Sequence, residues 1–133
     1  MSLDKALNTS MSQVPECVAA GYVDMSTGML LSVKTVDSHP SEVLDLVSAA
    51  TADLFQGTNV VAIEKMFKKS RGTTDNMHYF QEILVFSTNL LHVFLRGKKH
   101  HDHAVVFVCR GNANIGMVIA KARMQLATLE AAA

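Results

Sequence analysis

The sequence predicts an α+β domain in which helices flank a single antiparallel sheet. Segments with apolar residues at helical spacing alternate with short apolar runs, in the order helix, two strands, helix, three strands, helix. Residues 17–33 have the pattern of a hairpin, and residues 97–102 form the tip of a second one. The 133 residues are enough for one domain, 1–133, which buries roughly two-thirds of its unfolded surface on folding.

The composition of the chain argues against several classes of protein. The formal net charge is zero, whereas dedicated nucleic-acid binders carry a clear basic excess. The charge is unevenly spread: residues 1–64 hold eight acids and two bases, and residues 65–133 hold four acids and ten bases. No apolar stretch reaches about 18 residues, so no membrane span is predicted. Cys17 and Cys109 lie in apolar runs, which predicts buried free thiols in a reducing cytoplasm.

The first expected elements are a helix and a hairpin. Residues 3–14 carry apolar side chains at helical spacing, and Pro15 ends this short amphipathic helix. Two apolar runs, 17–23 and 29–33, flank the turn at 24–28, whose glycine supplies the positive φ that such a turn often needs. These runs predict the first two strands of the sheet.

The clearest helix covers residues 41–56 and shows two faces that predict buried contacts. We expect the more apolar stripe to cover the sheet; it consists of Val43, Leu46, Val47, Ala50 and Leu54. A further face, small in the middle and apolar at its ends, consists of Leu44, Ser48, Thr51 and Phe55. Because one sheet needs only one stripe, this second face predicts contact with another copy of the chain.

The second half of the chain predicts three strands and a final helix. Residues 58–78 fit either a helix or a strand, followed by a solvated loop. Strands are predicted at 78–87, 89–96 and 103–110. The second alternates, with one face made of Leu91, Val93 and Leu95 and the other of His92, Phe94 and Arg96. The third is apolar on both faces, as in a central strand. The segment 112–130 is a helix that Asn112 or Asn114 can cap.

The histidine-rich tip at 97–102 raises the question of a metal site. Zinc needs about four ligands in a tetrahedral arrangement, and no fixed carboxylate or thiolate completes a site with His101 and His103. Hairpin tips are exposed and polar because of their backbone alone. The chain also lacks the glycine-rich phosphate loops and nucleophile motifs of common enzymes. We therefore predict no catalytic, cofactor-binding or metal-binding residues.

Two methionines mark a possible partner surface on the final helix. Met117 and Met124 fall with Lys121 on the side opposite the core stripe, where charge is the usual occupant. Exposed methionine often marks an adaptable contact with another protein. The alternative is that the N-terminal segment covers this side of the helix.

The order of these elements resembles roadblock/dynein light chain domains. The hairpin AAGYVDMSTGMLLSV (19–33) is similar to their opening hairpin, and QEILVFST, NLLHVFLRG and AVVFVCR are similar to their three later strands. The helix start Asn114-Ile115-Gly116 is similar to theirs as well, and the resemblance spans about 14–129. The region 58–78 is longer than the family pattern.

The resemblance implies a five-stranded antiparallel sheet between helices, as in profilin-like folds. It also implies homo- or heterodimers formed through the long second helix and the third strand, which adds Leu84 and Phe86 to the expected interface. Such domains have no catalysis of their own; they scaffold complexes, serve as motor light chains or regulate Ras-like GTPases.

The function expected from the sequence is therefore a non-enzymatic, dimeric interaction module of the cytoplasm without a cofactor. Its partners would be a second copy and a small GTPase or a motor complex. The alternative is a PAS-like small-molecule sensor, which should enclose a pocket between sheet and helices. The small residues SAATA (48–52) allow the second helix to pack tightly, which favours the interaction module.

Overall fold

The computed structural model describes residues 2–36, 41–75 and 77–133, and for residues 41–46 it describes the helix but not the side chains. The helices are α1 (Leu3–Gln13), α2 (Ser41–Gln56), α3 (Thr58–Arg71) and α4 (Ile115–Ala132). The strands are β1 (Cys17–Asp24), β2 (Met29–Thr35), β3 (Glu82–Phe86), β4 (Leu90–Arg96) and β5 (His103–Arg110). They form one antiparallel sheet in the order β2-β1-β5-β4-β3, which confirms the predicted fold class.

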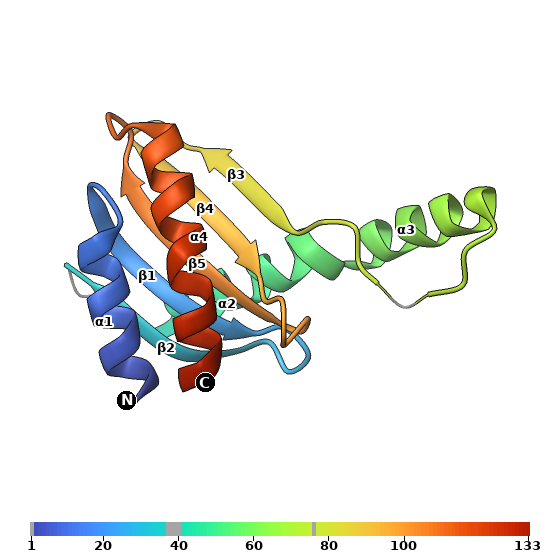
Figure 1. Cartoon of the computed structure of the whole chain (residues 1–133), viewed down its shortest axis with the longest axis horizontal. Coiled ribbons are helices and arrows are strands. Elements are labelled where there is room, and N and C mark those ends of the chain that lie inside the picture. The colour runs from blue at the N-terminus through green and yellow to red at the C-terminus, as the bar shows by residue number, and fades with distance from the viewer. Residues whose placement is uncertain (1, 37–40, 76) are drawn as a thin grey trace.

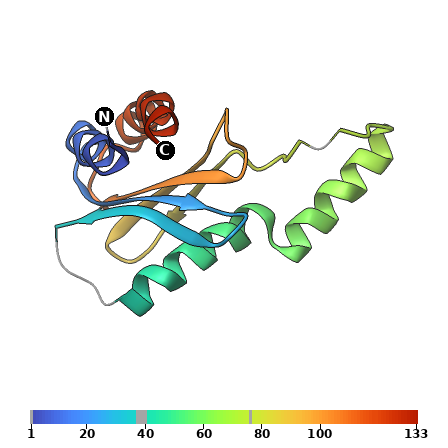
Figure 2. The ribbon, with the colours of Figure 1, turned by 90° about the horizontal axis from the view of Figure 1, so that it is seen from below.

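The sheet separates two layers of helices. Helices α1 and α4 lie side by side on one face, and α2 crosses the other face (Figure 1; Figure 2). The larger core lies between the sheet and the α1–α4 layer. It includes Ala6 and Leu7 of α1, both almost fully buried. The caps hold both helices at their starts: Ser2 accepts from the Lys5 N–H, and Asn114 accepts from the Met117 N–H.

Strand β4 shows the predicted alternation of faces. Its side chains at 91, 93 and 95 enter the core under α4, and Phe94 enters the smaller core under α2. Strand β5 lies at the centre of the sheet, paired with β1 and β4, as its apolar character predicts. Cys17 of β1 lies opposite Cys109 of β5, and both thiols are free.

The orientation of α2 differs from the prediction. Ser48, Thr51 and Phe55 face the sheet and are almost fully buried, whereas Val47 and Leu54 are exposed to 42% and 37%. The Ser48 hydroxyl donates to the Gly28 carbonyl at 2.9 Å, and the Thr51 hydroxyl donates to the Val47 carbonyl at 2.9 Å. Hydroxyls satisfied by backbone carbonyls can be buried at little cost, so the small face packs against the sheet.

The expectation that this small face is free for a second chain is therefore wrong for three of its four residues. Ser48, Thr51 and Phe55 lie inside the chain's own fold. The side chain of Leu44 lies outside the described residues. The face of α2 that remains open carries Val47, Ala50 and Leu54, which belong to the stripe that the sequence predicts to cover the sheet.

Helix α3 settles the ambiguous region 58–78. It follows α2 after Gly57, where an added Cβ would lie 2.7 Å from the Asp53 carbonyl oxygen, so glycine allows the close turn between the helices. The helix projects away from the sheet, and the chain returns along it to reach β3 (Figure 1; Figure 2). Glu64 accepts from the Tyr79 N–H at 2.5 Å and bonds His78 at 2.9 Å. These bonds hold the returning chain against α3, so β3 begins at Glu82 and not at residue 78.

Candidate functional site

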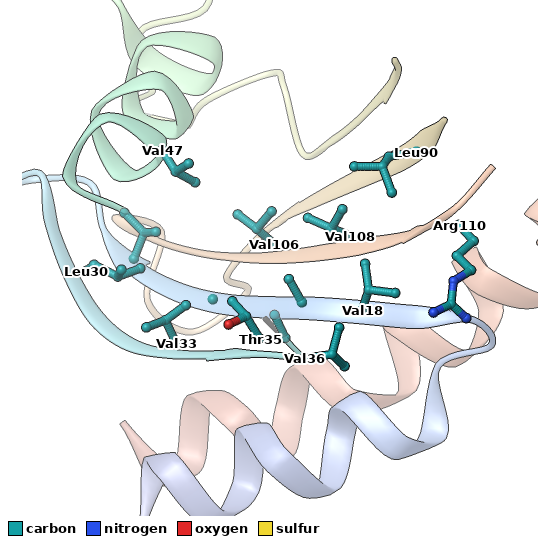
Figure 3. A pocket seen from close by; sticks show the side chains of 14 residues that line it. Val18, Leu30, Val33, Thr35, Val36, Val47, Leu90, Val106, Val108 and Arg110 are labelled. Atoms are coloured by element: carbon teal, nitrogen blue, oxygen red, sulfur yellow. The ribbon is translucent and has the colours of Figure 1, made fainter. Parts of the chain in front are cut away.

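An apolar pocket lies between the sheet and α2 (Figure 3). Its volume is about 420 Å³, within the range of small-molecule sites. Strands β1, β2 and β5 form its floor, Val47 of α2 overhangs it, and Leu90 of β4 closes one side. The other lining residues are Val18, Ala19, Ala20, Gly21, Val23, Leu30, Val33, Thr35, Val36, Val106, Val108 and Arg110.

Arg110 gives this pocket its single charge among the described lining residues. Its guanidinium lies 3.5 Å from the Glu16 carboxylate, and both side chains are largely exposed, so the pair is weakly held. An aliphatic floor with one cation at its end suits an apolar molecule that carries an anionic group.

A second apolar hollow lies between α2 and the end of the sheet at β3. Its volume is about 430 Å³, and its lining residues are Ala50, Asp53, Leu54, Val85, His92 and Phe94. Burial lowers the pKa of His92, which favours the neutral ring in this apolar setting. Strand β3 borders the hollow and is an edge strand of the sheet. Its outer N–H and C=O groups are therefore open to another chain.

The predicted interface residues of β3 are exposed. Phe86 is 62% exposed and Leu84 36%, and both point to the α4 side of the sheet, since they pair with Leu91 and Val93 of β4. Val85 points to the α2 side and is 37% exposed. Strand β3 thus presents apolar side chains on both of its faces.

Both methionines of the predicted partner surface are exposed on α4. Met117 is 49% exposed and Met124 65%, whereas Lys121 is half-buried. Helix α1 packs against α4, but it leaves these two methionines open. Next to Met124 in the sequence, Arg123 donates two hydrogen bonds to Glu82 at 2.7 and 2.6 Å, which tie α4 to β3 and lower the pKa of Glu82.

The histidine-rich tip is held by a buried glutamate that the sequence analysis missed. Glu130, near the end of α4, accepts from the N–H groups of Lys98, Lys99 and His100 at 2.9, 2.8 and 2.8 Å. Burial raises the pKa of Glu130, but these three donors more than offset it, and the net pKa is lowered. An added Cβ at Gly97 would lie 2.9 Å from the carboxylate, so glycine lets the tip close on it.

The histidines of the tip have different surroundings. His100 and His101 are exposed, whereas His103 is half-buried and its Nδ1 bonds the hydroxyl of the buried Tyr22 at 2.8 Å. The rings of His100 and His103 stack with centroids 4.7 Å apart. The tip is therefore more than a solvated loop, because a hydrogen bond and a carboxylate tie it to the fold. Within the described residues, no group of three metal-ligating side chains is placed to hold an ion.

Arg96 is the second buried group that sequence reasoning did not single out. It is 2% exposed, and its guanidinium donates to the carbonyls of Phe80, His101 and Phe55 at 2.9 Å each. It also donates to the Gln56 side chain at 3.0 Å and lies 5.0 Å from the Phe55 ring. The signal in the sequence that could have indicated a buried Arg96 is its position at the end of a strand with alternating faces. Its buried role depends on three segments that only the fold brings together.

No protein-family model matches the sequence, and a search of curated proteins finds no match. Solved structures do match along nearly the whole chain. A roadblock/LC7 domain from Streptomyces avermitilis superposes with a TM-score of 0.67 at 14% identity, covering 98% of this chain and 97% of that one. This chain has the roadblock fold. MglB in a tetrameric arrangement superposes with a TM-score of 0.70 at 18% identity, covering 98% and 87%.

The roadblock fold is related to that of profilin, as the resemblance implied. Profilin II from Acanthamoeba castellanii superposes with a TM-score of 0.61 at 10% identity, covering 96% of each chain. No helix within the described ranges is both long and apolar enough to cross a membrane.

Proposed function

We propose that this chain is a non-enzymatic interaction module of the cytoplasm that forms a homodimer and regulates a small Ras-like GTPase or scaffolds a larger complex. The exposed edge of the sheet at β3, beside an apolar hollow, carries this proposal. The roadblock fold supports it, because domains of this kind act through contacts with other proteins. MglB, which has this fold, occurs in a tetrameric arrangement, and this supports a role in assembly.

The proposed dimer places β3 of one copy against β3 of the other. Pairing at an edge satisfies the open N–H and C=O groups of both strands. Leu84 and Phe86 then lie at the centre, while Leu54 of α2 and the hollow beneath it receive side chains of the second copy. This interface retains Leu84 and Phe86 from the sequence analysis. It uses Leu54 in place of the residues that the fold buries.

The proposed partner surface lies on the exposed side of α4. Met117 and Met124 are adaptable apolar contacts beside the cationic Lys121. Regulation through this surface requires different affinities for the two nucleotide states of the partner. The chain contains no phosphate-loop motif, so we expect it not to hydrolyse the nucleotide itself.

Leu84→Glu tests the proposed dimer. We expect the unsubstituted chain to sediment at micromolar concentration as a species of about twice 14.5 kDa. The variant should dissociate, because burying an unpaired carboxylate costs several kcal/mol and raises the dimer Kd by about 100-fold or more. The matched control is Leu31→Glu, at 42% exposure on the opposite edge strand, which should stay dimeric.

The same sedimentation series separates the two surfaces. Lys121→Glu combined with Met124→Asp should leave the dimer intact and abolish capture of a GTPase from the native cell. A monomeric unsubstituted chain would refute the interface. GTP turnover by the purified chain that follows the protein peak on a column would refute the non-enzymatic assignment.

The pocket beneath α2 supports a second candidate function, a small-molecule sensor. We expect an apolar anion such as anilinonaphthalene sulfonate to bind there with increased fluorescence. Val108→Phe should fill the floor and abolish the signal, whereas Val61→Phe, on α3 and outside the pocket, should not change it. An unchanged signal in Val108→Phe would rule out binding at this pocket.

A further inference from the structure

Helix α3 stands apart from the rest of the fold. It packs on the end of α2 and on the chain that returns to β3, and most of its length projects beyond the sheet (Figure 1; Figure 2). Apart from Glu64, no residue of α3 is buried. A projecting helix of 14 residues that contributes almost nothing to the core needs another explanation for its sequence.

The open side of α3 is apolar. Ile63, Met66 and Phe67 are exposed to 42%, 70% and 48%. At about 100° per residue these three positions fall within roughly a third of the helix circumference. Large apolar side chains on one side of a projecting helix form a surface that favours leaving water.

Basic side chains border this apolar strip on both sides. Lys69 follows one edge and Arg71 the other. Lys65 and Lys68 lie further round the helix, and Lys68 pairs with Asp75 at 3.5 Å. Tyr79 fixes the second edge, with its ring 5.8 Å from the Lys68 ammonium and 5.9 Å from the Arg71 guanidinium. The long stems of lysine and arginine can lie along an apolar surface while their charges reach outward.

The one acid of α3 does not cancel this charge at the surface. Glu64 is 3% exposed and is bound by His78 and by the Tyr79 N–H. Burial raises its pKa, but the hydrogen bonds from His78 and Tyr79 outweigh it and the net pKa is lowered, so the carboxylate stays ionised and turned inward. The exposed part of the helix therefore presents bases and apolar groups together.

We propose that α3 binds the surface of an anionic lipid membrane. The helix lies in the plane of the interface with Ile63, Met66 and Phe67 at the boundary of the acyl chains. The flanking lysines contact lipid phosphates. Helices with an apolar strip, a lysine-rich polar face and low mean hydropathy bind membranes in this way.

The chemistry favours a lipid surface over a protein groove. Cores of protein interfaces are depleted in lysine, whereas three of the four bases here are lysine. Anionic headgroups attract each base near the surface with about a fivefold gain in affinity. The helix also projects beyond the sheet (Figure 1; Figure 2).

Vesicle flotation of the full chain tests this proposal. We expect binding to vesicles of phosphatidylcholine with about 30% phosphatidylserine, weaker binding at high salt, and little binding to phosphatidylcholine alone. Lys65→Glu with Lys69→Glu should reduce binding by at least about 25-fold. The matched control is Lys98→Glu with Lys99→Glu, which makes the same charge change at the exposed tip between β4 and β5 and should keep most of the binding.

Two variants that replace an exposed methionine by serine separate insertion of apolar side chains from attraction between charges. Met66→Ser should weaken binding severalfold, while Met29→Ser, at 59% exposure on β2, should not. Equal losses in the two lysine pairs, or equal binding to neutral vesicles, would overturn the proposal. So would loss of the dimer in the Lys65 and Lys69 variant, which would assign α3 to a second copy of the chain.

Discussion

Replacing Arg96 by methionine is expected to lower the free energy of unfolding by about 3–5 kcal/mol. Methionine preserves the apolar stem but leaves the carbonyls of Phe55, Phe80 and His101 without their donor. These carbonyls come from the end of α2, the approach to β3 and the β4–β5 tip, so one guanidinium joins three segments. Buried polar groups that lose their partners carry the full cost of desolvation.

Urea unfolding measures this loss. The protein concentration is kept the same for all variants, because the stability of a dimer depends on concentration. With a slope of about 2 kcal/mol per molar urea, the midpoint should fall by roughly 2 M. Arg123→Met is the control: it removes an exposed arginine bound to Glu82 and should leave the midpoint nearly unchanged. Arg96→Lys should recover only part of the stability, because an ammonium cannot reach all of the acceptors. A midpoint of Arg96→Met equal to that of the control would refute this role.

Glu130→Gln is expected to cost about 2 kcal/mol at neutral pH. The carboxylate accepts three N–H groups of the tip, whereas an amide places an NH₂ group against some of those donors. Because the pKa of Glu130 is lowered on folding, its contribution is complete above the unfolded value of about 4.3. It is lost as the pH falls from there through the folded pKa.

The difference between Glu130→Gln and the unsubstituted chain should therefore be constant near pH 7 and should shrink in acid. Denaturant unfolding at several pH values between about 7 and 3 measures this difference. The contributions of the other acidic residues are the same in both proteins and cancel in the difference. A difference that stays the same down to pH 3 would contradict an ionised Glu130 in the folded tip.

The sequence predicted the layers of this fold well because they follow from periodicity. Alternation in β4 placed Phe94 and Leu95 on opposite faces, and the structure confirms both. The turn at 24–28 and the cap at Asn114 fixed the ends of elements through local backbone chemistry. The order of these elements was also sufficient for the resemblance to roadblock domains, which the superposed structures confirm at the level of the fold.

The sequence alone could not determine which side of α2 meets the sheet. Periodicity gave two candidate stripes, and total apolar character favoured the wrong one. The deciding contact, from the Ser48 hydroxyl to the Gly28 carbonyl, joins residues on different elements. A buried hydroxyl is favourable only where a fold supplies its acceptor, so this choice belongs to the tertiary structure.

Dependence on distant contacts also explains why the sequence did not predict the buried roles of Arg96 and Glu130 or the projection of α3. The sequence shows a charged residue at the end of a strand, another near the end of a helix, and an ambiguous segment longer than the family pattern. Local patterns determined the strands, the helices and their order, because spacing and caps act over a few residues. Only the tertiary structure decided which charges are buried and which helix stands free, because those outcomes depend on groups that lie far apart in the chain.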